Sequence, residues 1–226
     1  MKISLPVLLS LNAGYLDTAG FLALHGLFTA HVTGNFVTIG AAATLGTGGV
    51  IGKLLALPVF CFVVVVTRVI ARRIEPRGVN VLRTMLSVKV VLLTLGAILA
   101  ISLGPFPNGD SSTAIVTGMC LVAGMAIQNA AQRIHFPTSP PTTLMTGTTT
   151  QIMIDIADRI HGLAPEEVPV VRARMARLAA AALAFATGCA GGALLFVSVR
   201  EWCFVIPPIL AAITPFLKPP PPVGAK

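Results

Sequence analysis

Apolar residues fill most of the chain in long stretches, and Gly, Pro and clusters of charge interrupt them at intervals. Most of the stretches approach the roughly 20 apolar residues that a helix needs to cross a bilayer. The pattern therefore predicts an all-α, polytopic membrane protein. The eight candidate segments are 3–24, 30–46, 51–71, 84–103, 112–131, 142–156, 178–199 and 202–217.

Two of these segments, 30–46 and 142–156, differ from the other six. They are shorter, richer in Thr and Gly, and each opens on a polar tripeptide after a short polar or Pro-rich link. Two topologies follow from this difference. Either all eight segments cross the membrane, or these two enter and leave on the same side as re-entrant or broken half-helices.

The distribution of basic residues separates the two topologies, because Lys and Arg concentrate in cytoplasmic loops. With eight crossings and the Arg-rich link 68–83 inside, the basic residues divide into eight inside and eight outside. With two re-entrant segments, both termini are cytoplasmic and the division is fourteen inside and two outside. The sequence therefore predicts six transmembrane helices plus two half-helices, with both termini in the cytoplasm.

In this topology each half of the chain crosses the membrane three times. Because three is odd, the second half begins on the opposite side of the membrane and is inverted relative to the first. A faint internal match agrees with this: Thr29–Asn35 aligns at an offset of 113 residues with Thr142–Thr148, sharing two Thr and one Gly. We expect an inverted repeat, with a first membrane repeat at 1–108 and a second at 109–217. The Pro-rich tail 218–226 is expected to be disordered.

A Thr-Gly motif at the start of a half-helix has a physical use at membrane depth. Thr and Asn cap free backbone amides, Gly lets a solute approach, and the helix dipole leaves positive partial charge there. Two such starts facing each other hold an anion or a polar solute in many transporters. The alternative interpretation is that these residues cap ordinary helices at the membrane interface. The residues expected to line the path are Thr33, Gly34, Asn35, Thr146, Gly147 and Thr148.

Asp17 is the only acidic residue of the first segment and lies far from either end. A carboxylate in hydrocarbon costs about 3 kcal/mol, so it must be protonated, paired or open to water. We expect Asp17 to act as an ionisable gate in the substrate path. The alternative is a structural hydrogen bond to Gln128 or Asn129, at the corresponding place in the second half. His31 precedes the first Thr-Gly motif and is a candidate proton-sensing residue.

Charge also gathers at the end of the sixth segment, where Asp155 is expected at the cytoplasmic surface with Asp158 and Arg159. The link 157–177 is the longest polar stretch, and its prolines predict a cytoplasmic loop. In the seventh segment, small residues recur every four positions, which lets helices pack closely in lipid. This seam packs either within one chain or between two chains of a homodimer. Its members are Ala180, Ala184, Gly188 and Gly192.

Composition supports the bilayer as the solvent. The chain is 55% hydrophobic and 11% charged, with a mean hydropathy of +0.87, whereas soluble proteins are about 25% charged. The formal charge of +8 would suggest nucleic acid in a soluble protein. These basic residues flank apolar stretches, so no nucleic-acid partner is expected. No catalytic motif, metal-ligand spacing or cofactor fingerprint occurs, and the four cysteines sit singly in apolar runs.

The run AGYLDTAGFLALHGLFTAHVTGNFV, from Ala13 to Val37, resembles the signature of the YoaK-like family of bacterial multi-span membrane proteins. In the second half, GMAIQNAA and TTLMTGTTTQ are similar to that family's pattern. His25, where a small residue is expected, and the insert FPTSPP at 136–141 depart from it. The resemblance implies a bacterial inner-membrane protein of repeated architecture and uncharacterised function, and it implies no substrate.

The leading hypothesis is that the protein is not an enzyme but a transporter or channel for a small polar or anionic solute. Its partners are then the lipid bilayer and that solute, and it needs neither a cofactor nor a metal ion. A second hypothesis is a membrane-embedded enzyme or cofactor-binding subunit that uses Asp17, His25, His31 and His135. A third is a non-transporting scaffold in which the Thr-Gly motifs serve packing.

Overall fold

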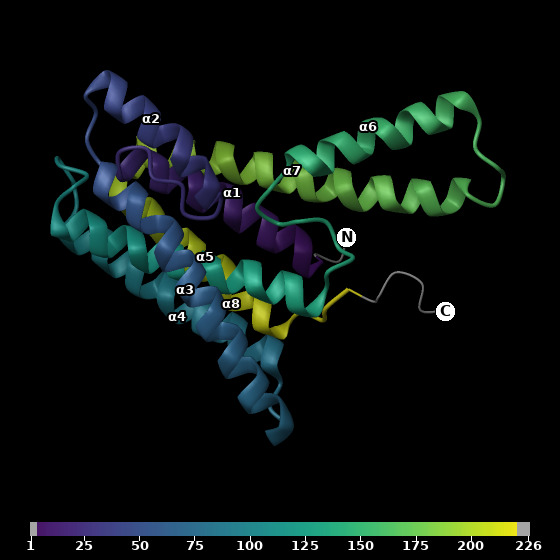
Figure 1. The fold of residues 1–226 in the computed structure, drawn as a ribbon, viewed down its shortest axis with the longest axis horizontal. Helices are drawn as coiled ribbons and strands as arrows, with labels where there is room; N and C mark the ends of the chain where they lie inside the picture. The colour runs from purple at the N-terminus through teal and green to yellow at the C-terminus, as the bar shows by residue number, and fades with distance from the viewer. Residues whose placement is uncertain (1–3, 221–226) are drawn as a thin grey trace.

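The computed structural model describes residues 4–220, and within them the chain forms eight α-helices and no β-strand (Figure 1). The predicted all-α class is thereby confirmed. Residues 221–226, most of the predicted disordered tail, lie outside the described residues. The helices are α1 (Leu5–Ala23), α2 (Asn35–Leu45), α3 (Val50–Ile74), α4 (Val81–Leu103), α5 (Ser112–His135), α6 (Thr146–His161), α7 (Val168–Val199) and α8 (Ile206–Ile213). Short 3-10 helices are η1 (Val32–Gly34), η2 (Glu75–Arg77), η3 (Arg200–Val205) and η4 (Thr214–Phe216).

Apolar side chains cover the outside of the long helices, where a soluble protein would expose no such continuous apolar surface. Phe62 on α3 is 69% exposed, Val91 on α4 is 65% exposed and Leu183 on α7 is 68% exposed. Four helical stretches within residues 4–220 are long and apolar enough to cross a membrane: Val50–Arg77, Val81–Leu103, Ser112–His135 and Val168–Phe216. The chain is therefore a multi-pass membrane protein, and lipid is the solvent that these side chains contact.

The most extensive contact between helices joins α1 to α7, which run parallel through the body (Figure 1). Their backbones touch at glycines. A Cβ atom built on Gly14 would lie 2.1 Å from the carbonyl oxygen of Phe185, and one on Gly188 would lie 2.1 Å from that of Leu11. Gly192 meets α1 one turn further along. Because small residues allow this approach, the glycines of the predicted seam pack within one chain.

A second group of helices forms around α5, which runs parallel to α3 and antiparallel to α4 (Figure 1). Glycine again allows the close approach to α4, because Gly96 lies against Leu121 and Gly124 against Leu93. The short helix α8 packs on both α4 and α1 and so joins the two groups. The body is thus two helix pairs, α1 with α7 and α3 with α5, closed by α4 and α8.

The structure differs from the prediction in two segments, the link 157–177 and the segment 202–217. The first was expected to be a loop because of its prolines, but a proline in the first turn of a helix does not break it. The link 157–177 is mostly helical, since α6 continues to His161 and α7 already begins at Val168. Pro169 lies in the first turn of α7, where its missing N–H costs no hydrogen bond. The segment 202–217 is not one regular helix but η3, α8 and η4 in succession.

The two short Thr-rich helices begin at their Thr-Gly motifs, as predicted. α2 starts at Asn35, directly after η1, and α6 starts at Thr146. α2 packs on α3 and α6 packs on α7, and the hairpin of α6 with the first part of α7 projects from the body (Figure 1). The predicted capping is wrong: within residues 4–220, no side chain caps the start of either helix.

The contact of α1 with α7 predicts that Gly188→Ala destabilises the fold. Its Cβ would collide with a backbone oxygen that cannot move alone, and overpacking of this kind costs about 1–3 kcal/mol. We expect the thermal unfolding midpoint of the detergent-purified protein to fall by about 2–10 °C. The matched control is Gly191→Ala, whose Cβ would lie 3.6 Å from the Tyr15 ring, an ordinary contact distance. Equal midpoints for the two variants would contradict this packing.

Candidate functional site

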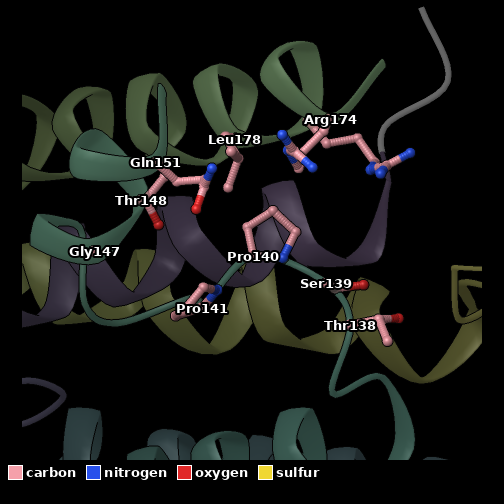
Figure 2. Close-up of a pocket in the computed structure, with 10 residues that line it drawn as sticks. Thr138, Ser139, Pro140, Pro141, Gly147, Thr148, Gln151, Arg174 and Leu178 are labelled. Atoms are coloured by element: carbon pink, nitrogen blue, oxygen red, sulfur yellow. The ribbon is translucent and has the colours of Figure 1, made fainter. Parts of the chain in front are cut away.

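A cavity of about 530 Å³ lies where the link from α5, the start of α6 and the first part of α7 meet (Figure 2). Its volume falls within the range of small-molecule binding sites. Basic and hydroxyl side chains share the walls with proline and leucine. The lining residues are Thr138, Ser139, Pro140, Pro141, Gly147, Thr148, Gln151, Arg174, Arg177 and Leu178.

The start of α6 forms one end of this cavity. Its first-turn amides have no carbonyl of their own helix to bond and carry the positive end of the helix dipole. Thr148 is 2% exposed, and its Oγ1 has no hydrogen-bond partner in the part of the chain that the structure describes. A Cβ atom built on Gly147 would meet nothing within 4 Å, so the backbone there is open to the cavity. Unsatisfied donors thus converge at this end.

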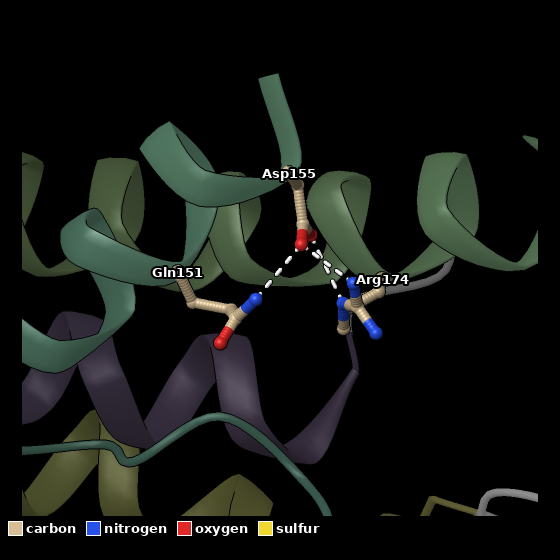
Figure 3. Close-up of polar contacts among 3 residues, drawn as sticks. All are labelled: Gln151, Asp155 and Arg174. Carbon is tan, nitrogen blue, oxygen red and sulfur yellow. Dashed lines mark hydrogen bonds and ion pairs between the residues drawn. The ribbon is translucent and has the colours of Figure 1, made fainter. Parts of the chain in front are cut away.

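The side wall of the cavity is held by an ion pair between α6 and α7 (Figure 3). Arg174 donates from Nε to Oδ2 of Asp155 at 2.9 Å and from Nη2 to Oδ1 at 2.5 Å. Gln151 Nε2 donates to the same carboxylate at 2.8 Å. Asp155 is fully buried, and the Arg174 guanidinium holds the pKa of that carboxyl below its usual range. Asp155 is therefore buried and paired with Arg174, whereas its expected position at the cytoplasmic surface with Asp158 and Arg159 stays a prediction.

The charge around the cavity is positive. Arg174 and Arg177 contribute two positive charges, and Asp155 contributes one negative charge, which leaves a net charge of +1. Within residues 4–220 Arg177 forms no ion pair, so its guanidinium stays available to a ligand. Arginine, a helix start and hydroxyl groups are the donors that bind carboxylates and phosphates. The arrangement can hold an anion of one negative charge.

Two side chains of α5 hold the link that forms the floor of the cavity. Gln128 Nε2 donates to Oγ1 of Thr142 at 3.0 Å, and Thr143 Oγ1 donates to Oδ1 of Asn129 at 2.9 Å. Both glutamine and asparagine were predicted in the substrate path. Gln128 and Asn129 do not line this cavity, although Asn129 lines a second one, of about 290 Å³, between α3 and α5.

Asp17 holds the first link in the same way. Its buried carboxylate accepts hydrogen bonds from the backbone amides of Thr29 at 2.8 Å, Ala30 at 2.6 Å and His31 at 3.0 Å. Among the described residues, Asp17 forms hydrogen bonds with this link and none with Gln128 or Asn129. The alternative of a structural hydrogen bond was therefore right in kind but wrong in its partner. The role of Asp17 as a gate stays a prediction.

The first Thr-Gly motif is closed by its own link. Asn35 is 2% exposed, and its carboxamide both accepts from the Phe28 amide and donates to the Phe28 carbonyl, each at 2.9 Å. The Phe28 ring lies 3.0 Å from the place of a Cβ on Gly34. Neither these residues nor Thr33 line the cavity at α6. A path shared by the two motifs stays a prediction.

The residues that sequence reasoning missed are those on the far side of the cavity, Gln151, Arg174 and Arg177. The run RARMAR carried a signal, since Arg174, Arg177 and Leu178 have the spacing of one helix face. That signal disappears when the run is interpreted as a loop. No group of three His, Cys, Asp or Glu side chains in residues 4–220 is placed to hold a metal ion.

Comparison with protein families places the chain by sequence. A family model described as a protein of unknown function (DUF1275) matches residues 5–217. Comparison with curated proteins found no match, and comparison with solved structures found none either. The matched range covers all eight helices, so both Thr-Gly motifs and the cavity belong to the family region.

The ion pair at the cavity predicts that Asp155→Asn loosens α6 from α7. Because Arg174 is partly exposed, we expect a loss of only about 1 kcal/mol, measured as about fivefold faster hydrogen exchange of the α6 amides. Because the pKa of Asp155 is lowered in the folded protein, the ion pair contributes its full stability at pH values above the usual pKa of an aspartate. That stability is lost as the pH falls through the lowered pKa. The wild-type protection factors of these amides, which correct for the intrinsic pH dependence of exchange, should therefore fall only in acid. The exposed Asp158→Asn is the control, and equal exchange in both variants would contradict the role of the pair.

Proposed function

The chain belongs to the DUF1275 family of YoaK-like uncharacterised membrane proteins, and from this premise we propose that it transports small organic monoanions across the bilayer. The observation that carries the proposal is the cavity at the start of α6. There, free helix amides, the unpartnered hydroxyl of Thr148 and the guanidinium of Arg177 line one cavity of a membrane protein. Among these donors the buried Thr148 Oγ1 lacks an acceptor within residues 4–220, and the exposed Arg177 is free to bind an anion.

The walls of the cavity favour an organic anion over an inorganic one. The net charge of +1 matches a single carboxylate, since Asp155 neutralises one of the two arginines. Pro140, Pro141 and Leu178 also line the cavity and present apolar surface to the rest of the ligand. A volume of about 530 Å³ leaves room for a carboxylate with a small apolar body. Short-chain 2-oxo and 2-hydroxy acids have this chemistry.

The arrangement of the helices supports an inverted repeat, which is the architecture that alternating access uses. If the half α1–α4 corresponds to the half α5–α8, then α1 is equivalent to α5, α2 to α6 and α3 to α7. The contact of α1 with α7 then has an equivalent in the contact of α5 with α3, and the structure forms both. Likewise, the contact of α2 with α3 has an equivalent in the contact of α6 with α7. Two halves built alike, with opposite orientation, offer one site alternately to each side.

The links before the two half-helices also correspond. Asp17 of α1 binds the link at residues 29–31, and Gln128 with Asn129 of α5 binds the link at residues 142–143. Phe28 closes the start of α2, whereas the start of α6 is open to its cavity. This difference fits an inward-open state under the topology that the Arg-rich segments predict, with α6 and both termini on the cytoplasmic side.

Transport by this site predicts uptake of pyruvate, but not of sulfate, into proteoliposomes. Arg177→Gln removes an exposed cation that supports no ion pair in residues 4–220, so it should leave the fold intact. Losing a charge-assisted hydrogen bond should raise the KM for pyruvate about tenfold or more. Arg172→Gln, an exposed arginine on the same helix outside the cavity, should keep the wild-type KM. The measurement is the initial rate of radiolabelled pyruvate uptake, and equal KM values in both variants would sink the proposal.

A gate at Asp17 predicts that Asp17→Asn slows flux without weakening binding. The variant replaces one acceptor oxygen by an NH2 group, which faces the backbone donors of residues 29–31 and loosens the first link. Pyruvate uptake should then fall about tenfold or more, while pyruvate affinity, measured calorimetrically at the distant α6 cavity, should stay unchanged. The control is Asp110→Asn, since Asp110 likewise accepts from the amides of Gly49 and Ile51 but on another link. Unchanged flux in Asp17→Asn would remove the gate and leave the binding site standing.

A further inference from the structure

Lys89, on α4, is a buried lysine that forms no ion pair within residues 4–220. It is 0% exposed, and its Nζ contacts Oε1 of Gln128 at 2.5 Å. The ion pair formed within residues 4–220 is that of Arg174 with Asp155, so no described carboxylate neutralises Lys89. An ammonium has three N–H donors, and here one acceptor serves them. A charged Lys89 would leave two N–H donors and a full charge uncompensated, whereas a neutral amine would leave one N–H donor without an acceptor and no charge.

Gln128 connects this amine to the candidate anion cavity. Its Nε2 donates to the carbonyl oxygen of Leu9 on α1 at 3.1 Å and to Oγ1 of Thr142 at 3.0 Å. Thr142 directly follows Pro141, which is part of the cavity wall. Two consecutive hydrogen bonds therefore lead from Lys89 to the link that shapes the cavity. The same carboxamide joins α1, α4, α5 and this link, which are the parts that must move relative to one another if the site alternates.

We propose that Lys89 carries the proton in a coupled transport of monoanion and proton, an inference that rests on the proposed function. With the cavity empty, Lys89 is a neutral amine. When a monoanion enters, a proton from water bonds to the lone pair of Nζ, and the ammonium and the anion compensate each other's charge. When the anion leaves on the other side, that N–H bond breaks and the proton returns to water. No bond of the anion changes, and the net movement of charge is zero.

Other ionisable side chains on the elements that pack against α4 lie elsewhere and do not form ion pairs with Lys89. On α5 the charged group and the histidine lie in the last turn, and on η3 the charged groups lie at the start, whereas α8 and η4 have none; the free thiols of Cys61, Cys120 and Cys203 also lie on these elements. Asp17 on α1 is engaged with the first link. The groups on the packed elements are Lys53, Arg68, Arg72, Arg73, Glu75, Arg77, Arg133, His135, Arg200 and Glu201. Lys89 is thus the ionisable group that Gln128 couples to the cavity.

The test is calorimetric binding of pyruvate to the full-length protein in detergent, in two buffers of different ionisation enthalpy. For wild type we expect uptake of about one proton per pyruvate bound. The apparent Kd should then rise about tenfold per pH unit over the range in which the empty site is neutral and the occupied site is charged. In Lys89→Met, proton uptake should vanish and the Kd should become independent of pH. The matched control Lys53→Met, which replaces the other lysine buried within residues 4–220, should behave as wild type.

The outcomes separate this inference from the proposed function. Pyruvate binding without proton uptake in wild type, or with uptake preserved in Lys89→Met, overturns the role of Lys89 and leaves anion transport intact. Absence of pyruvate binding in all proteins overturns the proposed function and the proton assignment with it. If Lys89→Met is not recovered as a monodisperse protein, the wild-type measurement and Lys89→Gln decide the matter in the same way.

Discussion

Buried backbone amides in the two links before α2 and α6 need hydrogen-bond partners inside the protein, because burial removes them from water. This constraint explains where the buried polar side chains lie. The carboxylate of Asp17 binds three consecutive amides of the first link, and Asn35 ties that link back on itself through Phe28. In the second half, Gln128 and Asn129 bind the link through threonine hydroxyls. α1 and α5, which carry Asp17, Gln128 and Asn129, are accordingly the helices with the largest buried share.

Close contact of α1 with α7 follows from the same requirement. Asp17 and the other buried polar groups of α1 can be kept from lipid only if α1 lies inside the body. Gly14, Gly188 and Gly192 make that possible, since any side chain there would meet a backbone oxygen. The long apolar faces of α3, α4 and α7 then surround this interior and contact the bilayer. The close packing of α1 on α7 thus produces both the polar interior and the apolar exterior of the protein.

The starts of the two short helices α2 and α6 differ in how much room they leave for a ligand. The start of α2 is filled by Phe28 and by the hydrogen bonds of Asn35, so it has no room for a ligand next to Gly34. The start of α6 has no such plug, and its link is instead drawn toward α5, which opens the cavity beside Gly147. Under the proposed function, the pair represents one side closed and the other open, and Lys89 lies on the hydrogen-bonded route between the moving parts.

Much of the architecture follows from the sequence, because apolar length, charge at helix ends and the Thr-Gly motifs are local properties. They determined the all-α class, the membrane, and the starts of α2 and α6. The lining role of Arg174 and Arg177 and the pairing of Asp155 depended on a helix that reaches back to Val168. The isolation of Lys89 depended on which residues of α5 face α4. Only the tertiary structure decided these, because burial and charge compensation arise between segments that are distant in sequence and have no local signature.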